Sequence, residues 1–295
     1  MRDGLACSTL LFDDRLEAEN MVPAPRIAER AEHERTRGTL FAILASLAMP
    51  VPAAAERTSS VDLELVLCAD VSSSMSEEEL HLQREGYVSA LRDPVVLRSI
   101  KSGRHGRIAL AYVEWAGPNY QRVLVPWTVI DTPSDAAALA EALRAQPIVR
   151  GRGTSISGAL LAADKLLAGA PAGDRTVIDV SGDGPNNAGL PLQPVHDAFI
   201  DAGVTINGLA ISLHAADTFD SFGPGYVELY YENCVIGGSG AFIATVENTA
   251  DFAKAIRNKL VNEIAGFSVS VQPAAFQIHS RRSVDCVSIG EAPGR

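Results

Sequence analysis

Residues 61–74 read VDLELVLCADVSSS, and this stretch decides the fold. Its first part, as far as Ala69, is rich in Val and Leu and is typical of a buried strand. Polar residues follow at once, because Asp70, Ser72 and Ser74 present a carboxylate and two hydroxyls at every second position. Such oxygen atoms are the ligands that Mg²⁺, Mn²⁺ or Ca²⁺ prefer, whereas zinc and copper favour nitrogen and sulfur. The stretch therefore predicts a strand with a hard-metal site at its carboxyl end.

Short strand-like runs alternate with helical stretches along the rest of the chain. This order predicts an α/β fold, a doubly wound and mostly parallel sheet of about six strands flanked by helices. The turn at residues 117–119 (Gly-Pro-Asn) joins two of the strands as a hairpin, so the second of the pair should be antiparallel and near an edge. The strands are expected at residues 61–69, 107–115, 121–127, 176–180, 204–211 and 241–246.

Helices are predicted between these strands from the spacing of their apolar residues. Ser76 and Glu79 form a capping box at the start of the first helix, and Pro94 is expected to end or bend that helix. The helices are expected at residues 76–91, 134–145, 155–167, 191–202 and 251–265.

Two later loops supply further oxygen ligands. Asp183 follows the strand at residues 176–180, and Thr154 stands just before a predicted helix. In an open parallel sheet, ligands gather at the carboxyl ends of the strands where the strand order reverses. Glycines beside both residues let the loops approach closely. The predicted metal ligands are Asp70, Ser72, Ser74, Thr154 and Asp183.

These three segments together resemble the metal-ion-dependent adhesion site of a von Willebrand factor A-type (vWA) domain, and the likeness extends from about residue 61 to residue 265. Residues 113–117, 179–184 and 234–238 resemble more closely a family of secreted proteobacterial proteins with this fold and no assigned function. The resemblance implies a bound divalent cation and a protein-binding role. It also implies that the Ser and Thr hydroxyls coordinate the ion directly, while the aspartates often act through water.

A first shell of three neutral hydroxyls and two carboxylates leaves a divalent ion incompletely neutralised. We therefore expect a non-enzymatic binding module that uses Mg²⁺ (or Mn²⁺ or Ca²⁺) to capture an Asp or Glu carboxylate of a partner protein. One alternative is a metal-dependent hydrolase or phosphatase with Asp70 as nucleophile and Asp183 as metal ligand. Against it, Ser72 stands where an acid/base residue is needed, and there is no Gly-x-Ser-x-Gly elbow with a suitable His. Another alternative is a structural domain with an empty site.

The N-terminus has the pattern of a secretory signal. Residues 39–49 form a short apolar run after two arginines, and small residues follow as far as Ala55. This predicts a leader over residues 1–55 that is cleaved near Ala55. The stretch before the apolar run is acidic, which favours a start at Met21. The alternative is an N-terminal helix of a cytosolic protein.

The charge of the remaining chain restricts its partners. The leader holds six Arg and eight Asp or Glu, which leaves 19 basic and 28 acidic residues and a net charge of about −9. This balance argues against nucleic acid or an anionic lipid surface as partner. No later segment reaches transmembrane length, so a secreted or periplasmic domain is expected. It should span residues 56–266, followed at 267–295 by a loose tail or an added edge strand, and its oligomeric state stays open.

Three cysteines remain after the leader, an odd number in an oxidising compartment. Cys68 lies inside the first strand and is most simply a buried apolar residue. A bridge between Cys234 and Cys286 is then available and would tie the tail to the domain, although sequence does not establish that pairing. No Cys/His cluster supports zinc.

A few other residues near the predicted site have two interpretations. Glu114 ends a strand at the same edge of the sheet, either as a partner or ligand of the metal or as a solvated strand end. Asn186 and Asn187 follow Asp183 and either line the rim or form a turn. Trp115 and Trp127 are expected to be packing residues. The six histidines are scattered, and none pairs with another at ligand spacing.

Overall fold

The computed structural model describes residues 60–213, 225–266, 284 and 286 of the chain. Its six strands form one sheet in the order β3-β2-β1-β4-β5-β6. Neighbouring strands are parallel except β2 and β3, which pair antiparallel at the edge. The predicted fold class is confirmed, including the antiparallel edge strand. The strands are β1 (Glu64–Asp70), β2 (Ile108–Trp115), β3 (Gln121–Ile130), β4 (Thr176–Gly182), β5 (Thr205–Ile211) and β6 (Ile243–Val246).

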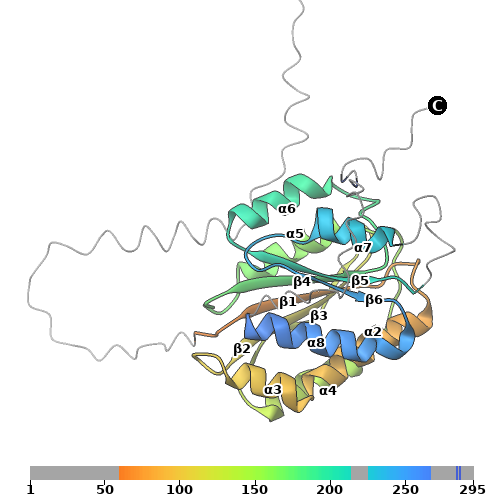
Figure 1. The fold of residues 1–295 in the computed structure, drawn as a ribbon. Helices are drawn as coiled ribbons and strands as arrows, with labels where there is room; N and C mark the ends of the chain where they lie inside the picture. The colour runs from red at the N-terminus through yellow and green to blue at the C-terminus, as the bar shows by residue number, and fades with distance from the viewer. Residues whose placement is uncertain (1–59, 214–224, 267–283, 285, 287–295) are drawn as a thin grey trace, which may run out of the picture.

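Helices cover both faces of the sheet. Figure 1 shows α2, α3, α4 and α8 on one face and α5, α6 and α7 on the other. A π-helix, η1 (Tyr231–Val235), continues α7, and a short 3₁₀ turn, η2 (Thr249–Asp251), leads into α8. The helices are α2 (Glu77–Leu91), α3 (Pro94–Lys101), α4 (Pro133–Arg144), α5 (Ile156–Leu167), α6 (Leu192–Asp201), α7 (Tyr226–Tyr230) and α8 (Phe252–Ala265).

Strand β1 lies in the middle of the sheet and is buried along its whole length. Alternate side chains of a strand point to opposite faces, so Leu65 and Leu67 join the core under α2 and α8. Val66 and Cys68 join the core under α5 and α6. Burying one such Leu or Val side chain stabilises the fold by roughly 1.5–3 kcal/mol. Cys68 is a buried free thiol, as predicted.

Capping residues mark the starts of the first two helices, α2 and α3. Ser76 and Glu79 form the predicted capping box at the start of α2. Helix α2 ends at Leu91, close to the predicted stop, but Pro94 then begins a new helix with Asp93 as its N-cap. Proline is suited to the first turn of a helix because its missing N–H needs no partner there. The sequence predicted the break and missed the second helix.

No helix among the residues that the structure describes is long and apolar enough to cross a membrane. The predicted leader and nearly all of the predicted tail lie outside the described residues. The boundaries at residues 55 and 266 therefore stay predictions.

Candidate metal site

The predicted ligands come from loops that meet at one edge of the sheet. Strands β1 and β4 are parallel neighbours, paired from Glu64 with Thr176 up to Ala69 with Ser181. After β1 the chain continues to β2 on one side of this pair, and after β4 it continues to β5 on the other side. This is the switch point of a doubly wound sheet, where loops at the carboxyl ends leave room for a ligand.

Four of the predicted ligand side chains lie in one chain of hydrogen bonds. The Ser72 N–H donates to Asp70 Oδ1 at 2.7 Å, and the hydroxyls of Ser72 and Ser74 share a hydrogen bond at 2.8 Å. The Ser74 hydroxyl then donates to Asp183 Oδ1, also at 2.8 Å. Residues more than a hundred positions apart in sequence are thus brought together within one small volume.

The loop that carries Thr154 lies against both of the other loops. Gly151 N–H donates to the Val71 carbonyl at 2.9 Å, so this loop extends the ladder beyond β1. On the other side, Asn187 Oδ1 accepts from the Thr154 N–H at 2.9 Å, and the Asn187 N–H donates to the Thr154 carbonyl at 2.8 Å. Gly153 sits between them with a φ of 78°, which glycine adopts without a Cβ penalty. Thr154 itself is buried.

The backbone at the end of β1 and in the loop after it is fixed by hydrogen bonds from two side chains, Gln83 and Arg150. The Gln83 amide of α2 donates to the Asp70 carbonyl at 2.9 Å and accepts from the Ser181 hydroxyl at 2.9 Å. Arg150 donates to the Ser73 carbonyl at 2.7 Å and to the Met75 carbonyl. These bonds give hydrogen-bond donors to backbone carbonyls that lie at or beyond the end of β1. They fix the loop backbone, and this in turn fixes the positions of the serine side chains.

The electrostatics of Asp70 favour a cation. Burial raises the pKa of Asp70 well above its usual range, and the nearby charge of Asp183 raises it further. Hydrogen bonds from Ser72 and from the Asp183 backbone act in the opposite direction. Among the described residues, Asp70 forms no ion pair, and its Oδ2 is buried without a hydrogen-bond partner. A positive ion between the two carboxylates would relieve both their repulsion and this unsatisfied atom.

The type of ligand atoms is also consistent with a hard metal. A Cβ on Gly182 would lie 2.8 Å from Asp70 Oδ2, so glycine lets the end of β4 pack closely against this carboxylate. The five predicted ligands offer oxygen atoms alone, which suits Mg²⁺, Mn²⁺ or Ca²⁺. The residues present therefore fit a hard divalent cation.

Glu114 is not the solvated strand end that was one of its two interpretations from the sequence. It is buried at the end of β2 and forms an ion pair with Arg84 of α2, with Arg122 of β3 as a second partner at 3.7 Å. Burial raises the pKa of Glu114, and the two arginines partly offset that effect. The strand end is thus not solvated, and Glu114 joins α2 to the sheet edge.

Asn186 and Asn187 connect their loop to the segment that carries Thr154 and the start of α5. Asn187 pairs with Thr154, as described above. Asn186 Oδ1 accepts from the Ser157 N–H at the start of α5, at 3.1 Å. The sequence did not single out Tyr231, whose buried hydroxyl lies beside Asp70. Trp115 is fully buried in the core, which confirms its predicted packing role.

A second group of possible metal ligands stands away from this site. Asp62, His105 and Asp174 offer ligand atoms that all lie within 4.8 Å of one another. The Asp174 carboxylate already receives two hydrogen bonds from Arg104, at 2.6 and 3.1 Å. Asp62 accepts from the His105 and Arg107 backbone N–H groups. The sequence missed this group because its three members come from distant segments, and its oxygens already have partners.

Solved structures share this fold. Proximal thread matrix protein 1 from the mussel byssus is 15% identical over 70% of this chain and 49% of its own, with a TM-score of 0.50. The pilus adhesin SpaC from Lactobacillus rhamnosus GG is 14% identical over 70% of this chain and 30% of its own, with a TM-score of 0.51. A von Willebrand factor type A protein from Catenulispora acidiphila is 16% identical over 70% of this chain and 43% of its own, at 0.48.

At these identities the likeness of the first two proteins shows the α/β fold alone, which is the fold class that the sequence predicted. The chain matches less than half of the length of each of the three proteins. No curated protein matches the sequence. One family profile matches residues 60–268, which is most of the chain and nearly all of the described domain. The chain therefore belongs to the family described as protein of unknown function DUF1194.

Proposed function

We propose that this domain binds one divalent cation, Mg²⁺ in the first instance, and uses it to capture a carboxylate of a partner protein. The observation that carries the proposal is the chain of hydrogen bonds from Asp70 through Ser72 and Ser74 to Asp183. It gathers two carboxylates and two hydroxyls, with the Thr154 loop tied to both sides. The proposed ligands are Asp70, Ser72, Ser74, Thr154 and Asp183.

The composition of the ligand set supports capture of an acidic group. Mg²⁺ prefers six oxygen ligands and keeps some waters. Here two carboxylates equal the charge of the ion in number, but three of the five proposed ligands are neutral hydroxyls that donate little negative charge to it. A water on the open side of the ion can therefore be replaced by a carboxylate from another protein, with a gain in electrostatic attraction.

Binding is favoured over catalysis by the surroundings of Asp70. As a nucleophile, Asp70 would have to reach a substrate, yet its side chain is completely buried. Ser72, the residue two positions later, uses its hydroxyl in the hydrogen bond with Ser74 and offers no acid or base. Among the described histidines, His196 contacts Asp197 and Ile236, and His105 contacts Asp174. The third, His81, is exposed on α2.

A location outside the cytoplasm agrees with the predicted leader. Cys234 and Cys286 form a disulfide, which is the pairing left open by the sequence. Disulfides persist in secreted and periplasmic proteins and are rare in the cytosol. We therefore propose a secreted or periplasmic protein.

The test is calorimetric titration of the full chain with Mg²⁺, Mn²⁺ and Ca²⁺. We expect one saturable site that is lost in both Asp70→Ala and Asp183→Ala. Asp174→Ala is the matched control, because it removes a carboxylate from the second acidic group and should leave binding unchanged. Absence of binding by the wild type, or its loss only in the control, would contradict the proposed site.

Carboxylate capture needs its own measurement. A glutamate-rich peptide should bind in the presence of Mg²⁺ and dissociate when EDTA is added. The chain has a formal net charge of −11, so without the metal the negative charges of the two partners would repel each other. Equal binding with and without the metal would rule out capture through the ion.

A further inference from the structure

Tyr231 carries a buried hydroxyl that has no hydrogen-bond partner among the described residues. Its side chain is completely buried, and Asp70 Oδ2 is a second unsatisfied atom in the same region. Burying a hydroxyl or a carboxylate oxygen without a partner is unfavourable, and native proteins contain few such atoms. Two such atoms near each other indicate that both interact with the same group.

The two atoms face the same small space. A Cβ on Gly182 would lie 2.6 Å from the Tyr231 hydroxyl and 2.8 Å from Asp70 Oδ2. Both atoms therefore pack closely against Gly182 on the same side of its backbone, which only a residue without a Cβ permits. A tyrosine hydroxyl can donate one hydrogen bond, and a carboxylate oxygen such as Asp70 Oδ2 can accept it.

The backbone holds Tyr231 in this position by several means. It is the first residue of the π-helix η1, and its carbonyl accepts from the Ile236 N–H at 3.0 Å. Gly208 of β5 makes room for the ring, because a Cβ there would lie 2.8 Å from Tyr231 Cδ1. Single turns of π-helix occur often at functional sites.

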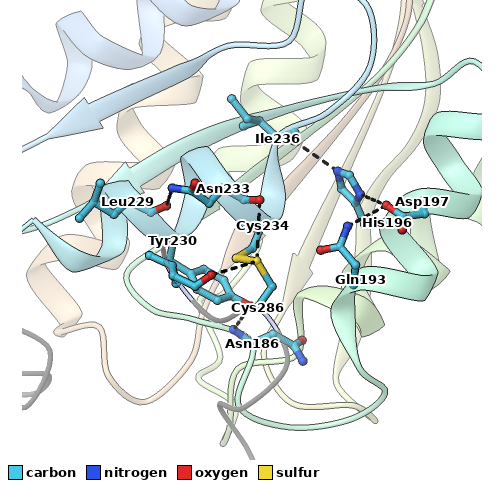
Figure 2. The surroundings of a disulfide bond; sticks show 11 residues. Asn186, Gln193, His196, Asp197, Leu229, Tyr230, Asn233, Cys234, Ile236 and Cys286 are labelled. Atoms are coloured by element: carbon cyan, nitrogen blue, oxygen red, sulfur yellow. Dashed lines mark hydrogen bonds and ion pairs between the residues drawn. A yellow bond between two sulfur atoms is a disulfide. The ribbon is translucent and has the colours of Figure 1, made fainter. Parts of the chain in front are cut away.

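A disulfide fixes the same short helix from its other side. Figure 2 shows Cys234, the fourth residue of η1, bonded to Cys286. The neighbouring Tyr230 hydroxyl accepts from the Asn186 N–H at 3.3 Å, so the two adjacent tyrosines differ. Tyr230 has a structural partner, whereas the hydroxyl of Tyr231 faces the predicted ligand.

We propose that Tyr231 is a positioning residue of the metal site, whose hydroxyl donates to Asp70 Oδ2 through one bridging water and orients that carboxylate toward the cation. This inference rests on the proposed function, since it assigns a role at the same site. A carboxylate that binds a metal is commonly held by a second hydrogen-bond donor, and loss of that donor weakens metal affinity about 10- to 100-fold.

The test compares two single-atom deletions in the full chain, Tyr231→Phe and Tyr230→Phe. Mg²⁺ and Mn²⁺ affinities are measured by calorimetry, and unfolding by urea is measured in EDTA. We expect Tyr231→Phe to bind metal at least 10-fold more weakly than the wild type, with metal-free stability equal or higher. Tyr230→Phe should show the reverse, with lower stability in EDTA and metal affinity within threefold of the wild type.

Results that contradict the role of Tyr231 differ from results that contradict the metal site itself. Unchanged metal affinity in Tyr231→Phe would overturn the positioning role and leave the metal site intact. A loss of metal-free stability in Tyr231→Phe as large as that in Tyr230→Phe would show that the hydroxyl is structural, which also overturns it. Absence of metal binding by the wild type would overturn the proposed function itself.

Discussion

Lys259 Nζ lies 2.6 Å from Asp179 Oδ1, and both side chains are completely buried. The pair joins α8 to the centre of β4. Glu263, one turn further along α8, also pairs with Lys259, and the Tyr87 hydroxyl donates to Asp179 at 3.2 Å. Burial alone lowers the pKa of Lys259, but the two carboxylates together raise it, so the ammonium stays charged. One lysine thus holds two acidic groups inside the core.

Lys259→Met should strongly destabilise the domain. Methionine fills a similar volume but leaves Asp179 and Glu263 buried without a cation. Removing one member of a buried ion pair usually costs about 3–5 kcal/mol. Urea unfolding should show this loss, and Lys254→Met, an exposed lysine on the same helix, should be nearly neutral. Equal stability of the two variants would mean that the network contributes nothing.

Glu263 should make stability depend on pH. Burial raises its pKa from 4.5 to about 7, and Asp179 adds to the effect while Lys259 opposes it. Between these values the folded state binds a proton that the unfolded state has released. Stability from this group is therefore complete below pH 4.5 and is lost as the pH rises through about 7.

Glu263→Gln tests this sign, because Gln resembles the protonated acid and does not titrate. The stability of the variant relative to the wild type should improve by up to about 3 kcal/mol between pH 4.5 and pH 8, as measured by urea unfolding in EDTA. Exposed Glu247→Gln is the control and should show no such change. A relative stability that is flat with pH would show that Glu263 is already ionised at neutral pH.

Gly182→Ala should damage both stability and the candidate site. The added methyl would meet the Tyr231 hydroxyl at 2.6 Å and Asp70 Oδ2 at 2.8 Å. Overpacking of this kind costs about 1–3 kcal/mol, and here it also fills the space beside the proposed ligand. We expect weaker Mg²⁺ binding by calorimetry. Gly169→Ala is the matched control, because its nearest neighbour would be 3.7 Å away.

The fold was predictable because its signals are local and agree with one another. The buried run of β1 and the capping box of Ser76 and Glu79 each specify one element without help from distant residues. The hairpin turn before Gln121 likewise identified the antiparallel edge strand. Helix α7 and η1 escaped prediction because they are short, and their apolar residues pack on β5 without a full helical period.

The candidate site was predictable only in part. Asp70, Ser72 and Ser74 lie close in sequence at a strand end, so their pattern is visible without the structure. The burial of Glu114 against Arg84 depends on how α2 packs on the sheet, which no local pattern contains. Tyr231 likewise comes near Asp70 only through the fold, because it packs on Gly208 of β5, the strand that pairs with β4.

Loss of the disulfide should lower both stability and metal affinity. Cys234 and Cys286 are 52 residues apart, so the bond restricts a long loop of the unfolded chain and contributes about 4 kcal/mol by the chain-entropy relation. Because Cys234 lies in the same π-helix as Tyr231, the double variant Cys234→Ser/Cys286→Ser should also bind Mg²⁺ more weakly. Urea unfolding measures the first effect and calorimetry on the folded variant measures the second. Cys68→Ala controls for loss of a thiol alone, since Cys68 forms no bridge. Reduced stability with unchanged metal affinity would mean that the bond anchors the C-terminal segment without holding Tyr231 against Asp70.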